Sequence, residues 1–180
     1  MVRRRFAISS VCAALAAALA LPSISSVSAD ENGRRNFSTK LKGFNEVTSI
    51  STTAEGSFRA RLSADGTSLH YTLSYEGLSP IVAQAHIHFG QQHTNGGVMV
   101  FLCQTATNAD PTGLAPTCPE TDGTVEGDIT AANIITVGAG DKGLLAGEFD
   151  EFVRALRNAS GYANVHTTPF PGGEIRGQIR

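Results

Sequence analysis

Three histidines in two similar segments are the residues whose types and spacing point to chemistry. His86 and His88 form a His-x-His pair in the stretch 85–88, and His166 ends the similar stretch 163–166. Each stretch leads through a polar loop to a Gly-Gly pair and then to another strand-like run. Residues two apart in a strand share a face, so His86 and His88 point together. Such a pair with a distant third histidine is one way to build a three-imidazole site for zinc or copper.

Further polar residues are expected beside His166. If segments 162–167 and 174–179 form a hairpin, Glu174 lies across from His166. Glu174 is then a candidate fourth ligand, or it holds an imidazole in one tautomer, a role that Asn164 also fits. Arg176 would pair with Glu174 or bind an anion. Two alternatives to a metal site stay open here: a hydrogen-bonded cluster without a metal, and ordinary exposed polar surface.

The elements that must position these side chains are mostly strands. Two runs with period-2 alternation, 57–62 and 68–75, flank the turn Asp65-Gly66, which is the strongest short-range signal for a hairpin. Segment 98–103 is apolar at successive positions, which predicts a central strand covered on both faces. Inward-facing glycines in segments 123–129 and 173–179 are expected to leave room for bulky neighbours.

One convincing helix accompanies these strands. Apolar residues at i, i+3, i+4 and i+7 predict an amphipathic helix over 148–158, and segment 130–133 resembles a capped helical turn. With short loops between neighbouring segments, we expect mainly antiparallel pairing. The predicted fold is therefore mainly β, an antiparallel β-sandwich or flattened barrel of about eight strands with one amphipathic helix and one short helical turn.

The N-terminal region predicts export. Residues 1–29 combine three arginines, an Ala/Leu-rich apolar run and a small-residue cleavage site, as in a secretory signal peptide. Residues 30–36 are then a flexible lead-in, and 37–180 form a single domain. The expected location is secreted or periplasmic, with general secretion favoured over the twin-arginine route.

The charge balance excludes some classes of binding partner. Without 1–29 the chain holds 11 basic and 16 acidic residues and has no further long apolar segment. An acidic domain without a basic run argues against nucleic-acid binding and adhesion to anionic lipid, and we expect no membrane anchor in the mature form. A protein or cell-envelope partner is not specified by the sequence.

Two cysteines remain after the predicted cleavage, Cys103 and Cys118. An even number of cysteines in an exported chain predicts a disulfide, and the alternative is two free thiols. Closing a loop of this length contributes about 3 kcal/mol in the chain-entropy model. No histidine follows Cys103 at the spacing of a copper-thiolate site, which argues against a metal-thiolate role.

Several motifs together resemble the CHRD domain, the module named after chordin and also found alone in exported bacterial proteins. They cover nearly all of the predicted mature chain, and the last two are the most specific. Thr48 stands where this family usually has proline, so the resemblance is weaker at that turn. The matching segments are 41–47, 60–75, 85–90, 95–98, 127–132, 149–157, 162–167 and 173–178.

The resemblance implies an exported β-rich module and no settled activity. The growth-factor-binding modules that accompany such domains in chordin are absent, so that role does not carry over. We favour a non-catalytic binding or structural module with a zinc or copper site at His86, His88 and His166. The alternatives are a metal-dependent enzyme that uses the same histidines and a metal-free interaction module. A copper-zinc superoxide dismutase would need more histidines than this chain can align.

Overall fold

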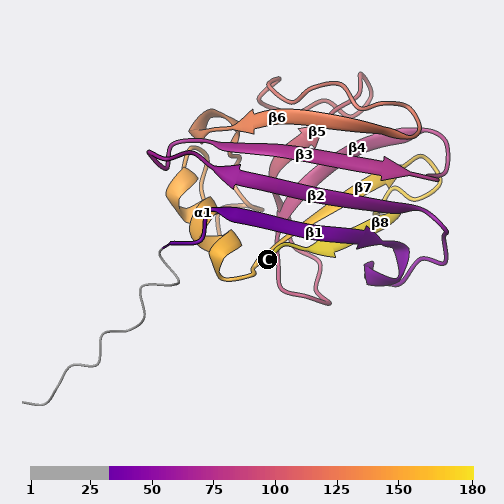
Figure 1. Ribbon diagram of the computed structural model, residues 1–180, viewed down its shortest axis with the longest axis horizontal. Helices are drawn as coiled ribbons and strands as arrows, with labels where there is room; N and C mark the ends of the chain where they lie inside the picture. The colour runs from indigo at the N-terminus through magenta and orange to yellow at the C-terminus, as the bar shows by residue number, and fades with distance from the viewer. Residues whose placement is uncertain (1–32) are drawn as a thin grey trace, which may run out of the picture.

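The computed structural model describes residues 33–180, and the predicted signal peptide lies outside them. This part of the chain forms eight strands, one α-helix and two short 3-10 turns (Figure 1). The strands are β1 (Asn36–Lys42), β2 (Glu55–Leu62), β3 (Leu69–Glu76), β4 (Val82–Phe89), β5 (Gly97–Cys103), β6 (Gly123–Ile129), β7 (Gly161–Thr167) and β8 (Ile175–Gln178). The helical elements are η1 (Gly43–Asn45), η2 (Ala131–Asn133) and α1 (Phe149–Arg157). Within residues 33–180, no helix is long and apolar enough to cross a bilayer.

All eight strands belong to one antiparallel sheet that curls into a nearly closed, flattened barrel. Its order is β5-β4-β7-β8-β1-β2-β3-β6, and in Figure 1 strands β4, β5 and β7 lie behind β1, β2 and β3. The hydroxyl of Tyr71 on β3 donates to the carbonyl of Leu102 on β5 across the interior, at 2.5 Å. The predicted architecture is therefore confirmed.

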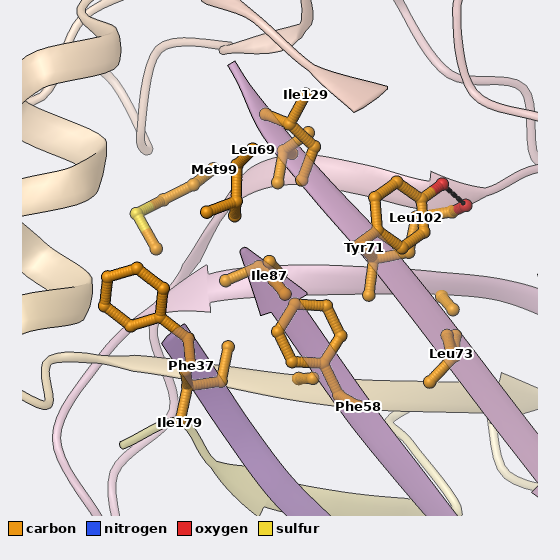
Figure 2. Close-up of a cluster of buried hydrophobic side chains, with 14 of the residues drawn as sticks. Phe37, Phe58, Leu69, Tyr71, Leu73, Ile87, Met99, Leu102, Ile129 and Ile179 are labelled. Carbon is orange, nitrogen blue, oxygen red and sulfur yellow. Dashed lines mark hydrogen bonds between the residues drawn. The ribbon is translucent and has the colours of Figure 1, made fainter. Parts of the chain in front are cut away.

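The interior of the barrel is filled by side chains from alternate strand positions. Phe58 and Leu73 face Ile87 and Leu102 from the opposite half, and all four are buried (Figure 2). The alternation of the β2–β3 hairpin fixes this arrangement, because successive side chains of a strand point to opposite faces. Helix α1 contributes further apolar side chains from its inward face.

The close packing of this interior explains one inward glycine. A Cβ atom on Gly127 would lie 2.9 Å from the ring of Tyr71, so β6 can approach that ring only where a side chain is missing. The sequence prediction that inward glycines accommodate bulky neighbours is confirmed at this position.

The sequence predicted that segment 98–103 forms a central strand. Strand β5 instead lies at one end of the sheet order. Its residues are apolar at successive positions because the sheet closes on itself. Met99 and Leu102 are fully buried, and so are the neighbouring Val100 and Cys103. Burial of both faces in a closing barrel gives the same sequence pattern as a central strand of an open sheet.

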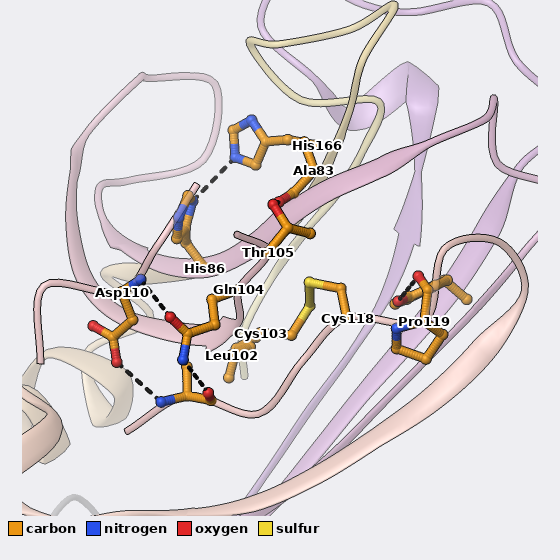
Figure 3. The surroundings of a disulfide bond; sticks show 12 residues. Ala83, His86, Leu102, Cys103, Gln104, Thr105, Asp110, Cys118, Pro119 and His166 are labelled. Carbon is orange, nitrogen blue, oxygen red and sulfur yellow. Dashed lines mark hydrogen bonds between the residues drawn. A yellow bond between two sulfur atoms is a disulfide. The ribbon is translucent and has the colours of Figure 1, made fainter. Parts of the chain in front are cut away.

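The disulfide links Cys103 at the end of β5 to Cys118, as predicted (Figure 3). The enclosed loop is irregular, and it is organised around buried Asp110. The carboxylate of Asp110 accepts hydrogen bonds from the backbone amides of Thr112, Leu114 and Ala115. The loop is thus fastened both covalently and by its own polar contacts. A disulfide fits an oxidising compartment.

Candidate metal centre

The pairing of β4 with β7 brings the three histidines together. His86 lies opposite Asn164, and His166 lies opposite Gln84, so these side chains share the outer face of the barrel wall. One ring nitrogen from each of His86, His88 and His166 can be chosen so that all three atoms lie within 4.8 Å of one another. Figure 3 shows His86 and His166 directed toward each other. The predicted convergence of three imidazoles is therefore present.

The cluster is buried although it lies on the outer face of the sheet. His86, His88 and His166 are 2%, 9% and 6% exposed. The loop 90–97 and the turn 168–173 supply backbone contacts to it, described below. The interpretation of these histidines as ordinary exposed surface is wrong, because loops cover this part of the sheet.

Two backbone carbonyls fix the tautomers of two rings. The Nδ1 atom of His88 lies 2.9 Å from the carbonyl oxygen of Gly96. The Nδ1 atom of His166 lies 2.9 Å from the carbonyl oxygen of Pro171. A carbonyl oxygen can only accept, so each Nδ1 carries the proton of a neutral ring. The Nε2 atoms of His88 and His166 are then left with a lone pair, the state in which imidazole binds a metal.

The third ring completes the cluster and leaves two nitrogens without partners. The Nδ1 atom of His86 lies 3.2 Å from the Nε2 of His166, so His86 donates to that lone pair in the metal-free protein. The Nε2 atoms of His86 and His88 are buried and have no hydrogen-bond partner among the described residues. A buried polar atom without a partner is rare in folded proteins.

Burial keeps the three rings uncharged. Desolvation lowers the pKa of His86, His88 and His166 below the ordinary value for histidine. The mutual repulsion of the charged forms lowers the pKa of His86 and of His88 further. All three imidazoles are therefore neutral near pH 7 and need not lose a proton before they bind a metal ion.

A stack of three side chains holds one edge of the cluster. The ring of Tyr162 lies parallel to that of His88, with centroids 4.8 Å apart. The guanidinium carbon of Arg176 lies 3.3 Å from the centroid of the Tyr162 ring. Arg176 also donates to the carbonyl oxygen of Thr94 at 2.6 Å, and the hydroxyl of Tyr162 accepts from the amide of Gly96 at 3.1 Å. The stack thereby fastens the loop 90–97 over His88.

Glu174 does not join the histidines. Strand β8 begins at Ile175, and the carboxylate of Glu174 accepts hydrogen bonds from Thr52, Ser79 and Thr167 instead. The expected pair between Glu174 and Arg176 is also absent from the ion pairs of residues 33–180. Glu174 ties the loops before β2 and β4 to the end of β7, which is a structural task.

Asn164 lies beside His166, as the sequence predicted. It also contacts an acidic residue that the sequence did not reveal. Its side-chain amide lies 3.0 Å from the Nε2 of His166, and because this nitrogen carries a lone pair, it is the NH2 end of the amide that can donate to it. Its amide group lies against the carboxylate of Glu46, which is 6% exposed. Desolvation raises the pKa of Glu46 to about 7, although Arg176 and Asn164 oppose this effect. A second carboxyl group is therefore buried next to the cluster.

The residues missed by sequence reasoning differ in the signals they offered. Tyr162 shares the strand parity of Asn164 and His166, so its place on this face could have been inferred. Glu46 lies just after η1, where no periodicity assigns a direction to a side chain. His70 is outside the cluster, as expected for a surface histidine, and its Nδ1 lies 3.0 Å from an exposed carboxylate oxygen of Asp128.

Comparison with models of protein families gives a match over most of the chain. The family model of the CHRD domain matches residues 37–179, which include all eight strands except the first residue of β1. A search of curated proteins finds no match. The matched range contains the three histidines, both disulfide cysteines and the helix. The chain therefore belongs to the CHRD domain family.

Proposed function

We propose that this protein is an exported, non-catalytic binding or structural module that holds one zinc or copper ion between His86, His88 and His166. The observation that carries the proposal is the pair of buried Nε2 atoms without partners, on His86 and His88. A metal ion bound to the cluster supplies a partner for buried lone pairs that otherwise lack one.

The donor set favours zinc or copper. Three neutral imidazoles without a carboxylate ligand suit these metals and do not suit magnesium or calcium, which prefer oxygen. The carbonyl oxygens of Gly96 and Pro171 accept from the Nδ1 atoms of His88 and His166. Such contacts around metal-bound histidines orient the ring and raise its basicity.

Burial favours a structural or sequestering role over catalysis. The most exposed of the three rings, that of His88, is 9% exposed, and the loop 90–97 is fastened over it by Arg176 and Tyr162. A metal-dependent enzyme needs an open coordination position that its substrate reaches. The enzyme alternative therefore requires this loop to move.

A metal-free interaction module is the second candidate. The hydrogen bond between His86 and His166 favours it, because it gives these two rings a use without an ion. The two candidates differ in one respect: the metal-free module leaves the Nε2 atom of His88, whose Nδ1 is held by Gly96, permanently unpaired.

Export rests on two features. Residues 1–29 have the composition of a secretory signal peptide, and the Cys103–Cys118 disulfide fits the secreted or periplasmic space. Mass spectrometry of the protein recovered from the culture medium or periplasm tests this. We expect a mature chain that starts at or near residue 30, and an intact N-terminus in the cytoplasm would contradict export.

Titration of the untagged protein with zinc and copper tests the metal site. After chelation and dialysis, we expect binding of one ion per chain. His88→Phe preserves a ring beside Tyr162 and should weaken binding about a hundredfold or more by removing one ligand. His70→Phe removes an exposed imidazole elsewhere and should leave binding unchanged. No stoichiometric binding of either metal, or an equal loss in both variants, would refute the proposed site.

A further inference from the structure

The outer face formed by β8, β1 and β2 gathers most of the positive charge of the domain. Residues 33–180 contain 11 lysines and arginines, and six of them occupy outward positions on these three strands and on the second residue after β8. Five of them are exposed, Lys40, Lys42, Arg59, Arg61 and Arg180, and the sixth, Arg176, is 2% exposed. We refer to this surface as the cationic face.

The strand register places these side chains next to one another. Ser38 on β1 lies opposite Arg59 on β2, and on its other side it exchanges two backbone hydrogen bonds with Arg180. Lys40 is two residues further along β1 and therefore points the same way. Arg59, Lys40 and Arg180 are all exposed, and neighbouring positions on one sheet face are about 5 to 8 Å apart.

Little negative charge offsets this face. Glu55 is the one acidic residue at an outward position of β8, β1 and β2, and its carboxylate pairs with Lys42 at 3.4 Å. Neither the Lys40 ammonium nor the Arg59 guanidinium takes part in a hydrogen bond or ion pair within residues 33–180. Their charges are free to attract a ligand in an otherwise acidic domain.

A hollow opens on this face, where β8 meets the loop 90–97. Its volume is about 410 Å³, and every one of its lining residues is polar or basic. The basic ones are Lys40, Arg176, Arg180 and His93. The others carry hydroxyl or amide groups, as Ser38 and Gln178 do, and no acidic residue lines the hollow.

We propose that the cationic face binds an anionic polysaccharide. Lysine and arginine side chains pair with carboxylate or sulfate groups. The hydroxyl and amide groups of the hollow suit the hydroxyls of the intervening sugars, which both donate and accept hydrogen bonds. The three adjacent strands β8, β1 and β2 offer a continuous surface along which an extended chain with regularly spaced acidic groups can lie.

Two other polyanions fit less well. A membrane surface would be held more firmly with apolar side chains at the contact, and none of the large exposed apolar residues of the described chain lines the hollow. Unpaired nucleic acid is usually held by aromatic rings that stack on bases, and no aromatic residue other than His93 lines the hollow. The site uses none of His86, His88 and His166, and Arg176 is the residue that it shares with the surroundings of the metal proposal.

Binding of the full chain to immobilised polygalacturonate and dextran sulfate tests the proposal. These probes carry carboxylates and sulfates respectively, so the tighter of the two identifies the acidic group. We expect binding at about 20 mM ionic strength that weakens toward about 150 mM, as for contacts between exposed charges.

The matched variants are Lys40→Ser with Arg59→Ser, and Lys142→Ser with Arg154→Ser. Each pair removes two exposed positive charges, the first from the cationic face and the second from the loop before α1 and from α1 itself. We expect the first pair to weaken binding at least about tenfold and the second to change it less than about twofold. Circular dichroism confirms that both fold.

Three results would overturn the proposal. One is the absence of binding to either polysaccharide at low salt. Another is an equal loss in both pairs of variants, which would mean that only net charge matters. The third is tighter binding to DNA or to vesicles of anionic lipid than to both polysaccharides, which would assign the face to a different class of partner.

Discussion

Replacing Glu46 by glutamine should remove one contribution to the stability of the metal-free protein that is lost as the pH rises. The carboxyl group of Glu46 is 6% exposed, and its Oε1 atom has no hydrogen-bond partner among the described residues. Burial raises its pKa from 4.5 to about 7. Glutamine has nearly the same shape as the protonated acid and cannot ionise, so it keeps the form that the folded protein prefers.

The sign of the effect follows from proton binding in the two states. Between pH 4.5 and 7 the unfolded chain releases the proton of Glu46 while the folded chain retains it. The contribution of Glu46 to the free energy of unfolding therefore falls as pH rises through this range, and the comparison with the variant separates it from the titration of the histidines. Each pKa unit corresponds to about 1.4 kcal/mol, so the loss is on the order of 3 kcal/mol and is complete above about pH 7.

Urea unfolding of wild type and Glu46→Gln in the presence of chelator measures this loss. We expect the variant to gain stability relative to wild type as pH rises from 5 to 8, by on the order of 3 kcal/mol in total. Glu126→Gln, which removes an exposed carboxylate, controls for the change in net charge. A difference between Glu46→Gln and wild type that stays constant over this range would refute a buried, protonated Glu46.

Three further substitutions test other parts of the structure. Replacing Cys103 and Cys118 by serine should lower the free energy of unfolding by about 3 kcal/mol, measured by urea denaturation, and an unchanged midpoint would contradict a structural disulfide. Gly127→Ala should destabilise the fold by about 1–3 kcal/mol, because the new Cβ meets the ring of Tyr71, and a neutral effect in thermal unfolding would show that the ring moves freely. Asn164→Ala should not weaken zinc or copper binding, because Asn164 contacts the Nε2 of His166 that the metal would take while Pro171 holds the Nδ1, and a loss of tenfold or more in a metal titration would contradict this assignment of the ligating nitrogen.

The sequence was most informative where alternation fixes the direction of side chains. The period-2 pattern of 57–75 predicted the β2–β3 hairpin, and the same parity argument placed His86 and His88 on one face. His166 lies beside them because β4 pairs with β7. This pairing joins segments that are distant in the sequence, and the similarity of the two motifs was its only sign.

The sequence was least informative where the chain leaves regular structure. The alternation of side chains along a strand points Glu174 toward His166 only if Glu174 belongs to β8. Strand β8 begins one residue later. Glu46 is brought to the cluster by an irregular segment whose path depends on tertiary contacts. Segment 98–103 resembled a central strand because barrel closure buries both of its faces.

The cationic face illustrates a further limit of reading charge along a chain. A search for basic runs finds none in β1 and β2, because alternate positions of each strand are turned into the core. Only the register of β8, β1 and β2 shows that Lys40, Arg59 and Arg180 lie together. The acidic net charge of the domain conceals this segregation.

Anomalous diffraction from crystals of the untagged protein, equilibrated with zinc or copper and collected at the absorption edge of that metal, tests the metal site most directly. We predict one strong peak, about 2.0–2.1 Å from one ring nitrogen each of His86, His88 and His166. Crystals with no peak among these three rings, or with metal bound only elsewhere on the surface, would contradict the central claim.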